Sequence, residues 1–147
     1  SIKTFLNYKI PTNVGLYIKD KESYLLKLGP DELLYINSKK KLSSLTNFHN
    51  NLIKSKSAVT DVSDHYQALY LNGEWVRWIL SKGCPINLDE SVFKTGHCAQ
   101  TILGHVNIML LCEDKNSFLI IFVASYLNYV IKWLKVSSQE HGYKITI

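Results

Sequence analysis

The pair Asn72-Gly73 constrains the fold of this chain more than any other local feature. It stands between two runs rich in aromatic and aliphatic residues, in the stretch HYQALYLNGEWVRW at residues 65–78. A two-residue type I′ turn requires positive φ at both central positions, and Asn-Gly adopts that conformation readily. The sequence therefore predicts a β-hairpin over residues 67–80, which Gly83 and Pro85 would end.

Upstream of this stretch, three short β-prone runs occupy residues 14–20, 23–28 and 32–36. The breaker sequence at residues 29–31, Gly-Pro-Asp, separates the second run from the third, so we expect a three-stranded meander. In residues 43–53, two serines precede apolar residues at helical spacing, and this pattern predicts a helix.

Downstream, residues 106–111 (VNIMLL) are typical of a buried strand, and residues 114–116 of a turn. Residues 90–103 have a mixed pattern that a helix would fit. The apolar segment at residues 117–136 is interpreted as a helix with Ser117 as its N-cap, although its β-branched residues leave a strand open at its start. The expected fold class is α+β: an antiparallel sheet of hairpins with a long apolar C-terminal helix packed on it, in a single domain over residues 1–147.

Composition bounds the class of protein and its location. The chain is 46% hydrophobic and 20% charged, which favours a folded core over a disordered chain. We expect a cytoplasmic protein, because no signal peptide opens the chain and three cysteines cannot all pair within it. The apolar run at residues 118–126 is less than half as long as the ~20 residues that a membrane span needs. A buried helix is favoured, and peripheral membrane contact through residues 117–136 is the alternative.

A lysine-rich segment favours an anionic partner. The formal net charge is +5, and residues 33–60 contain no acidic residue. A solvated face is the ordinary interpretation of such a segment. The functional interpretation is an RNA-binding patch whose side chains contact phosphates. The residues of this predicted patch are Lys39, Lys40, Lys41, Lys54 and Lys56.

His65 and Cys112 are the candidate catalytic residues. If residues 117–136 form a helix, Cys112 lies near its N-terminus, where the helix dipole favours the thiolate. A histidine on a neighbouring strand could then act as base. The alternative is a buried structural cysteine, since cysteine is among the most commonly buried residue types. We expect no metal and no cofactor: the set Cys84, His97, Cys98, His105 and Cys112 has no Cys-x-x-Cys pair.

Three short motifs carry a resemblance to a known family. HYQALYLNGEWVRW resembles the H-box hairpin of the lecithin:retinol acyltransferase-like branch of the NlpC-type, papain-like fold. CEDKNSFLIIF, beginning at Cys112, resembles the NC motif of that branch, and GPDELLYI is similar to its upstream strand. Over roughly residues 29–135 the chain resembles the H-box/NC class of picornavirus 2A proteins. Two positions differ from the family's motifs. Leu111 replaces the asparagine of the NC motif, and Arg77 or Trp78 replaces the second-strand histidine of the cellular enzymes.

The resemblance implies two functions of different classes. The viral class implies a non-structural accessory protein of the host-cell cytoplasm that binds RNA, supports viral replication and is not catalytic. The cellular enzymes imply a thiol acyltransferase or phospholipase, with Cys112 as nucleophile and His65 as base. Leu111 favours the first of these, and a host-protein interaction module is a further alternative.

Overall fold

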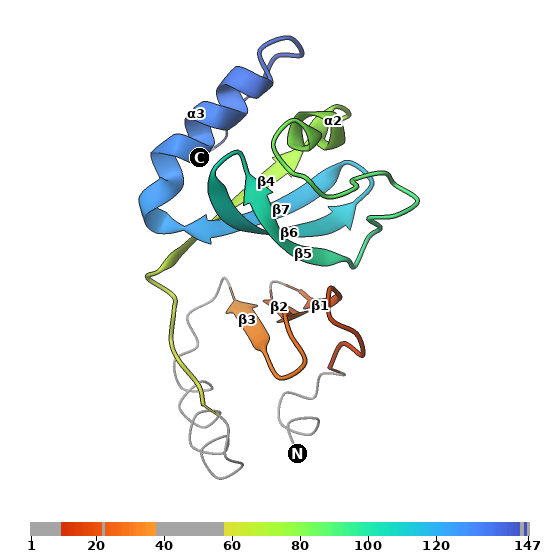
Figure 1. Ribbon diagram of the computed structural model, residues 1–147, viewed down its shortest axis with the longest axis vertical. Coiled ribbons are helices and arrows are strands. Elements are labelled where there is room, and N and C mark those ends of the chain that lie inside the picture. Colours follow the sequence, from red (N-terminus) through yellow and green to blue (C-terminus); the bar gives the residue numbers. More distant parts are fainter. Residues whose placement is uncertain (1–9, 22, 38–57, 145, 147) are drawn as a thin grey trace. The chain divides into compact units, whose positions relative to one another are not determined.

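The computed structural model describes residues 10–21, 23–37, 58–144 and 146 (Figure 1). The chain divides into two compact units, residues 1–62 and residues 63–147. We describe each unit separately, and a single domain over residues 1–147 stays a prediction. The helix predicted in residues 43–53 lies outside the described residues.

The described part of the first unit is a three-stranded antiparallel meander, as predicted. Its strands, in the order β1-β2-β3, are β1 (Tyr17–Asp20), β2 (Ser23–Lys27) and β3 (Leu33–Asn37). The turn between β2 and β3 contains the predicted breaker at residues 29–31. The backbone N–H groups of Leu28 and Gly29 both donate to the Glu32 carbonyl oxygen there, at 3.1 and 3.3 Å.

The second unit is built on a four-stranded antiparallel sheet in the order β4-β7-β6-β5 (Figure 1). Its strands are β4 (Tyr66–Asn72), β5 (Cys98–Leu103), β6 (Val106–Asp114) and β7 (Ser117–Val123). The strand and the turn predicted at residues 106–111 and 114–116 are confirmed. The helix that the mixed pattern of residues 90–103 left open does not form; the segment ends in strand β5.

The hairpin predicted over residues 67–80 is also wrong. Strand β4 forms, but Gly73 leads into helix α2 (Val76–Ser81) instead of a second strand. The partner of β4 is β7, and the chain after Gly73 instead forms a helix that packs on the core. Val76 and Leu80 are both buried, and their four-residue spacing places them on one face of a helix turned toward the core.

The predicted long C-terminal helix is also wrong, because the first part of that segment is a strand. Residues 117–123 form strand β7, and only afterwards come the 3₁₀ turn η2 (Ala124–Tyr126) and helix α3 (Leu127–Ser137). Alternate residues of β7 line the core, and β4 and β6 flank it. The expected α+β fold is therefore corrected to a mostly β structure with two antiparallel sheets. In the described part of the chain, no helix is long and apolar enough to cross a membrane.

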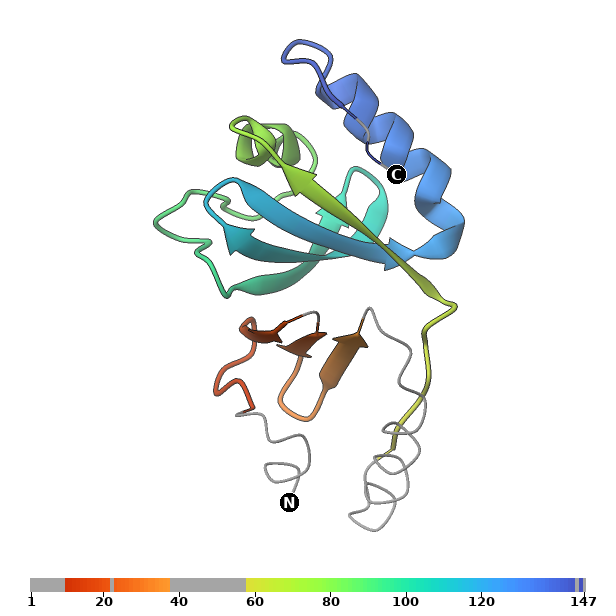
Figure 2. The ribbon, with the colours of Figure 1, turned by 180° about the vertical axis from the view of Figure 1, so that it is seen from behind.

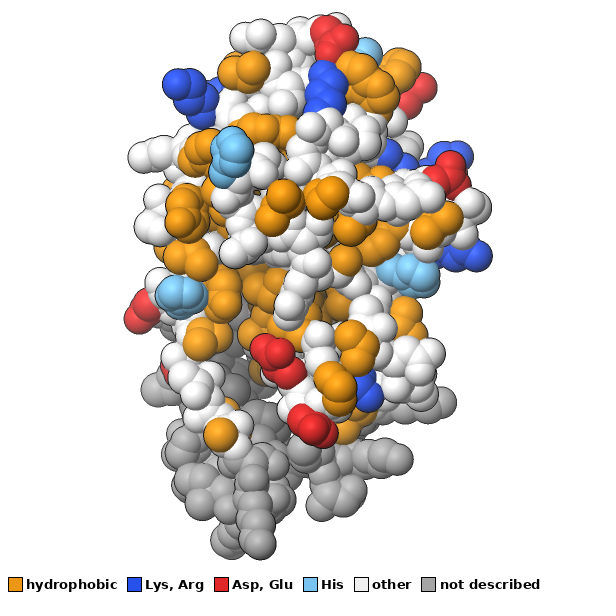
Figure 3. Space-filling model, viewed as in Figure 1, with side chains coloured by type: hydrophobic (Ala, Val, Ile, Leu, Met, Phe, Trp, Pro, Cys, Tyr) orange, Lys and Arg blue, Asp and Glu red, His pale blue; other side chains and the backbone are white. Residues whose placement is uncertain are grey.

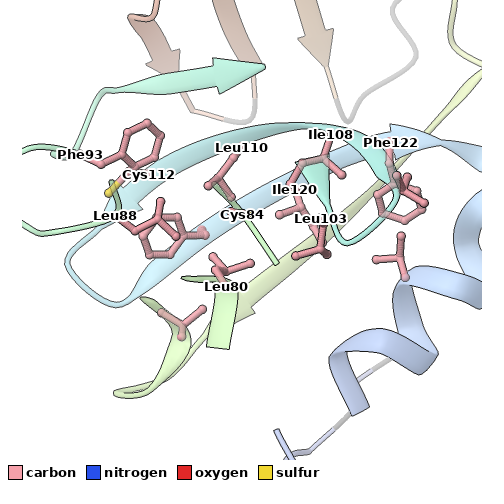
Figure 4. Packing of buried hydrophobic residues seen from close by; sticks show 14 residues of the cluster. Leu80, Cys84, Leu88, Phe93, Leu103, Ile108, Leu110, Cys112, Ile120 and Phe122 are labelled. Atoms are coloured by element: carbon pink, nitrogen blue, oxygen red, sulfur yellow. The ribbon is translucent and has the colours of Figure 1, made fainter. Parts of the chain in front are cut away.

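The hydrophobic cluster of the second unit lies on one face of its sheet, under α2, α3 and the loop between α2 and β5, and Met109, Leu111 and Ile121 on the opposite face are buried as well. Figure 4 shows Ile108, Leu110 and Cys112 of β6 in this cluster, with Ile120 and Phe122 of β7 beside them. The cluster also includes Val76, Leu80, Cys84, Leu88, Phe93, Leu103, Phe118 and Val130. Alternate residues along β6 and β7 therefore share one layer, as the two-residue period of a strand requires.

Candidate functional site

The Arg77 side chain donates four hydrogen bonds within the second unit. Its Nη1 donates to the carbonyl oxygens of Leu88 and Phe93, at 2.7 and 3.0 Å. Its Nε donates to the carbonyl oxygen of Lys115 at 2.8 Å, in the turn between β6 and β7. The side chain thus ties helix α2 both to the loop before β5 and to a sheet turn.

The fourth donor contact of Arg77 reaches Cys112. Arg77 Nη2 lies 3.3 Å from Cys112 Sγ, and the guanidinium stands 4.9 Å from the centre of the Phe118 ring. Burial raises the pKa of the Cys112 thiol, and the charge and hydrogen bond of Arg77 offset only part of that effect. In Figure 4, Cys112 lies among apolar side chains that include Leu88 and Phe93. This environment favours a protonated thiol packed in the core.

Cys112 does not open a helix, because it lies within strand β6, which turns back into β7. The helix dipole that would favour the thiolate is therefore missing from its surroundings in the described structure. Cys112 is opposite Phe118 on β7, and Phe118 is opposite Leu71 near the end of β4.

His65 lies at the other end of the sheet. It immediately precedes β4, and its carbonyl oxygen accepts a hydrogen bond from the Ala124 N–H at 2.8 Å. Six residues of extended chain separate it from Leu71, which is about 20 Å at the usual rise of a strand. The structure therefore does not bring His65 and Cys112 together. The His65 ring instead stands edge-on to the Tyr66 ring, with 4.8 Å between their centres.

The other two cysteines are buried as well. Burial raises the pKa of both Cys84 and Cys98 to about 11. Among the described residues, no group of three or more histidine, cysteine or acidic side chains is arranged to hold a metal ion. The five lysines of the predicted RNA patch, Lys39, Lys40, Lys41, Lys54 and Lys56, lie outside the described residues.

An exposed aromatic surface joins helix α2 to the chain that follows α3. The indole of Trp75 stacks on the His141 ring with 4.3 Å between centres, and Trp78 meets the same ring edge-on at 5.0 Å. Lys82 Nζ stands 3.7 Å from the centre of the Trp78 ring and pairs with Glu140 at 2.5 Å. Trp75 and Trp78 remain 47% and 42% exposed. Tryptophans presented in this way are typical of protein–protein contacts.

Sequence reasoning treated Arg77 only as a departure from a motif and missed its role. The signal was a single arginine in the otherwise apolar run VRWIL at residues 76–80. Arginine is rarely buried unless its donors are satisfied, so such a residue indicates a hydrogen-bonded anchor.

Hydrophobic side chains also reach the surface at several places on the face in Figure 3.

Comparison with known proteins gives a consistent set of matches. A model of the sarcosine oxidase, gamma subunit family matches residues 1–140. The chain is 27% identical over 126 residues to the sarcosine oxidase subunit gamma of Corynebacterium sp. strain U-96, covering 85% of this chain and 61% of that protein. The subunit from strain P-1 is also 27% identical over 126 residues, with 62% of it covered. The chain thus spans about three fifths of the length of these curated relatives.

A solved structure has the same fold. The chain is similar to one chain of the heterotetrameric sarcosine oxidase from Corynebacterium sp. U-96 in complex with pyrrole 2-carboxylate. The TM-score is 0.88 at 24% identity, and the match covers 99% of this chain and 75% of that chain. At this level of identity the likeness shows the fold alone.

These matches overturn the resemblance to the H-box/NC class of picornavirus 2A proteins. The supposed H-box is a strand followed by helix α2, and the supposed NC cysteine lies in a strand. The viral accessory function, the thiol acyltransferase or phospholipase alternative, and the RNA and host-protein partners are therefore wrong. Membrane contact through residues 117–136 is also withdrawn, because most of strand β7 is buried.

Proposed function

The chain belongs to the sarcosine oxidase gamma subunit family, and on that premise we propose that it serves as a gamma-type subunit of a heteromeric sarcosine oxidase. The observation that carries this proposal is the family match over residues 1–140, nearly the whole chain. The partners it implies are the other subunits of the same enzyme, and the oxidation of sarcosine would be an activity of the assembly.

The side chains of the second unit support a role in assembly. The three buried thiols have raised pKa values, so each is poorly suited to act as a nucleophile near neutral pH. The exposed tryptophans Trp75 and Trp78, by contrast, have the residue type that dominates binding energy at protein interfaces. Their stacking on His141 holds them in place before binding, which reduces the side-chain entropy that association would cost.

Co-expression tests the proposal directly. The chain would be produced with the remaining sarcosine oxidase subunits of its source organism and examined by size-exclusion chromatography with light scattering. We expect the chain to elute within the assembly and the assembly to consume oxygen in the presence of sarcosine. Elution of the chain apart from the other subunits, at micromolar concentrations of each, would refute the proposal. Omitting the chain from the expression shows whether the assembly requires it.

A further inference from the structure

In the part of the chain that the structure describes, one edge of the four-stranded sheet has backbone groups that no strand pairs with. Strand β4 is that edge, and Figure 2 shows it running across the front of the second unit toward α2. The Ala124 N–H donates to the His65 carbonyl oxygen at 2.8 Å, and the Gly73 N–H donates to the Asn116 carbonyl oxygen at 3.0 Å. Both pairs follow the continuous register between β4 and β7.

These two bonds determine which backbone groups of β4 point outward. In an antiparallel pair, residues that exchange hydrogen bonds alternate with residues that do not. Because the odd-numbered positions 65 and 73 are bonded to the β7 side, the even-numbered residues of β4 direct their N–H and C=O groups away from β7. Within the described residues no strand pairs with that side. The outward-facing residues are Tyr66, Ala68, Tyr70 and Asn72.

Strand β4 itself lacks the sequence features that protect an edge strand exposed to water. Natural edges are blunted by lysine, proline, a β-bulge or a very short strand. Strand β4 has seven residues, YQALYLN, with no charge and no proline, and its register with β7 contains no shift. Ala68 and Tyr70 are exposed, with Tyr70 at 57%. An edge of this kind is suited to accepting another strand.

The opposite edge of the sheet, β5, is less suited to this role. At one end Cys98 is buried, with only 3% of its surface exposed. At the other end the turn after β5 is already bonded, since the Gly104 N–H donates to the Gly83 carbonyl oxygen at 3.1 Å. Strand β4 therefore offers the longer accessible edge.

We propose that strand β4 is the docking site for a strand of another subunit of the enzyme. Only an extended segment can match N–H and C=O groups that recur every second residue. The added strand would be largely uncharged, with apolar side chains on the face that carries Ala68 and Tyr70. Another subunit is the favoured occupant because the relatives of this chain are subunits of a heteromeric enzyme; a second copy of this chain is the alternative that the test distinguishes. This inference rests on the proposed function.

Hydrogen exchange in the assembled enzyme tests the inference at single residues. In the free chain, we expect the amides of residues 66, 68, 70 and 72 to exchange fast and those of residues 67, 69 and 71 to exchange slowly. On assembly, the even-numbered amides should slow by about tenfold or more as they gain bonded partners. The odd-numbered amides are internal controls on the same strand.

Two substitutions in the full-length chain test the edge by affinity. In Ala68→Pro, the lost N–H points outward, so the bonds to β7 are kept while an added strand is blocked. Tyr70→Lys places a charge on the edge without disturbing a buried group. Each should weaken association with the other subunits about tenfold or more. Tyr143→Lys is the matched control, because Tyr143 is 54% exposed and lies outside the sheet.

The outcomes separate the inference from the proposed function. If the wild-type chain does not join the assembly, both are overturned. If the wild-type chain joins but exchange at the even-numbered positions and the affinity of Tyr70→Lys are unchanged, only the docking site is overturned. If Tyr70→Lys abolishes self-association and leaves the assembly intact, a second copy occupies the edge and the proposed occupant is wrong. Thermal unfolding by circular dichroism verifies that each variant folds, and Tyr70→Lys keeps the test valid if Ala68→Pro does not.

Discussion

Replacing Arg77 with methionine should destabilise the second unit substantially. Three hydrogen bonds from the guanidinium are partly buried, and they end on the carbonyl oxygens of Leu88 and Phe93 and on Cys112 Sγ. At roughly 1 kcal/mol net for each, their loss should lower the free energy of unfolding by about 3 kcal/mol. Methionine keeps the apolar stem of the side chain, so most of the loss would come from the missing donors.

Urea unfolding followed by tryptophan fluorescence measures this change. With total stabilities of about 5–15 kcal/mol, a loss of this size shifts the midpoint clearly while leaving the slope unchanged. Arg77→Lys keeps the charge but lacks the planar fork, so it should recover only a minor part of the stability. Lys132→Met removes an exposed cation from α3 and should change the stability by less than about 0.5 kcal/mol.

A small effect would refute this reasoning. If the free energy of unfolding of Arg77→Met is within about 0.5 kcal/mol of the wild-type value, the contacts of Arg77 contribute no more to stability than those of an ordinary surface residue. Full recovery of stability by Arg77→Lys would also contradict it, because charge alone would then be sufficient.

Three further predictions concern the packing and the titration of the second unit. Leu110→Ala empties part of the core and should cost about 3 kcal/mol in a urea titration; a cost below 1 kcal/mol would mean that the site collapses around the change. Gly83→Ala should lower the melting temperature, since its Cβ would clash with the Trp133 ring; an unchanged melting temperature would show that the ring moves aside freely. Cys84 and Cys98 have pKa values raised from about 9 to about 11, so the stability that each contributes is complete below pH 9 and falls as the pH rises toward 11. Urea titrations at several pH values should show this fall in the wild type and a smaller one in the double variant Cys84→Ala/Cys98→Ala; equal falls would rule out the two thiols as its source.

The predicted catalytic pair shows how short motifs mislead. A strand followed by Asn-Gly and a second apolar run has the pattern of a hairpin, and a histidine in front of it resembles a catalytic motif. In this chain the same local pattern folds as a strand followed by a turn and a short helix. The distance between His65 and Cys112 depends on the strand order β4-β7-β6, which neither motif contains.

The aromatic surface formed by the two tryptophans and His141 could not be predicted from the local sequence either. The tryptophans at residues 75 and 78 were visible in the sequence, but their stacking partner is His141, more than sixty residues later. Periodicity could not place them outside the core, because α2 is too short to show a clear apolar stripe.

The sequence by itself determined the elements that depend on neighbouring residues. The meander of the first unit, the strand at residues 106–111 and the turn at residues 114–116 all follow from alternation and breaker residues within a few positions. Tertiary structure decided the states of residues 76–81 and 117–123. Their local patterns fit both helix and strand. For residues 117–123 the strand is chosen by the pairing of β4 with β7, whose contact between Asn72 and Ser117 spans 45 residues. The segment after Gly73 does not pair with the free edge of β4; as a helix it satisfies its backbone groups internally and buries Val76 and Leu80 in the core.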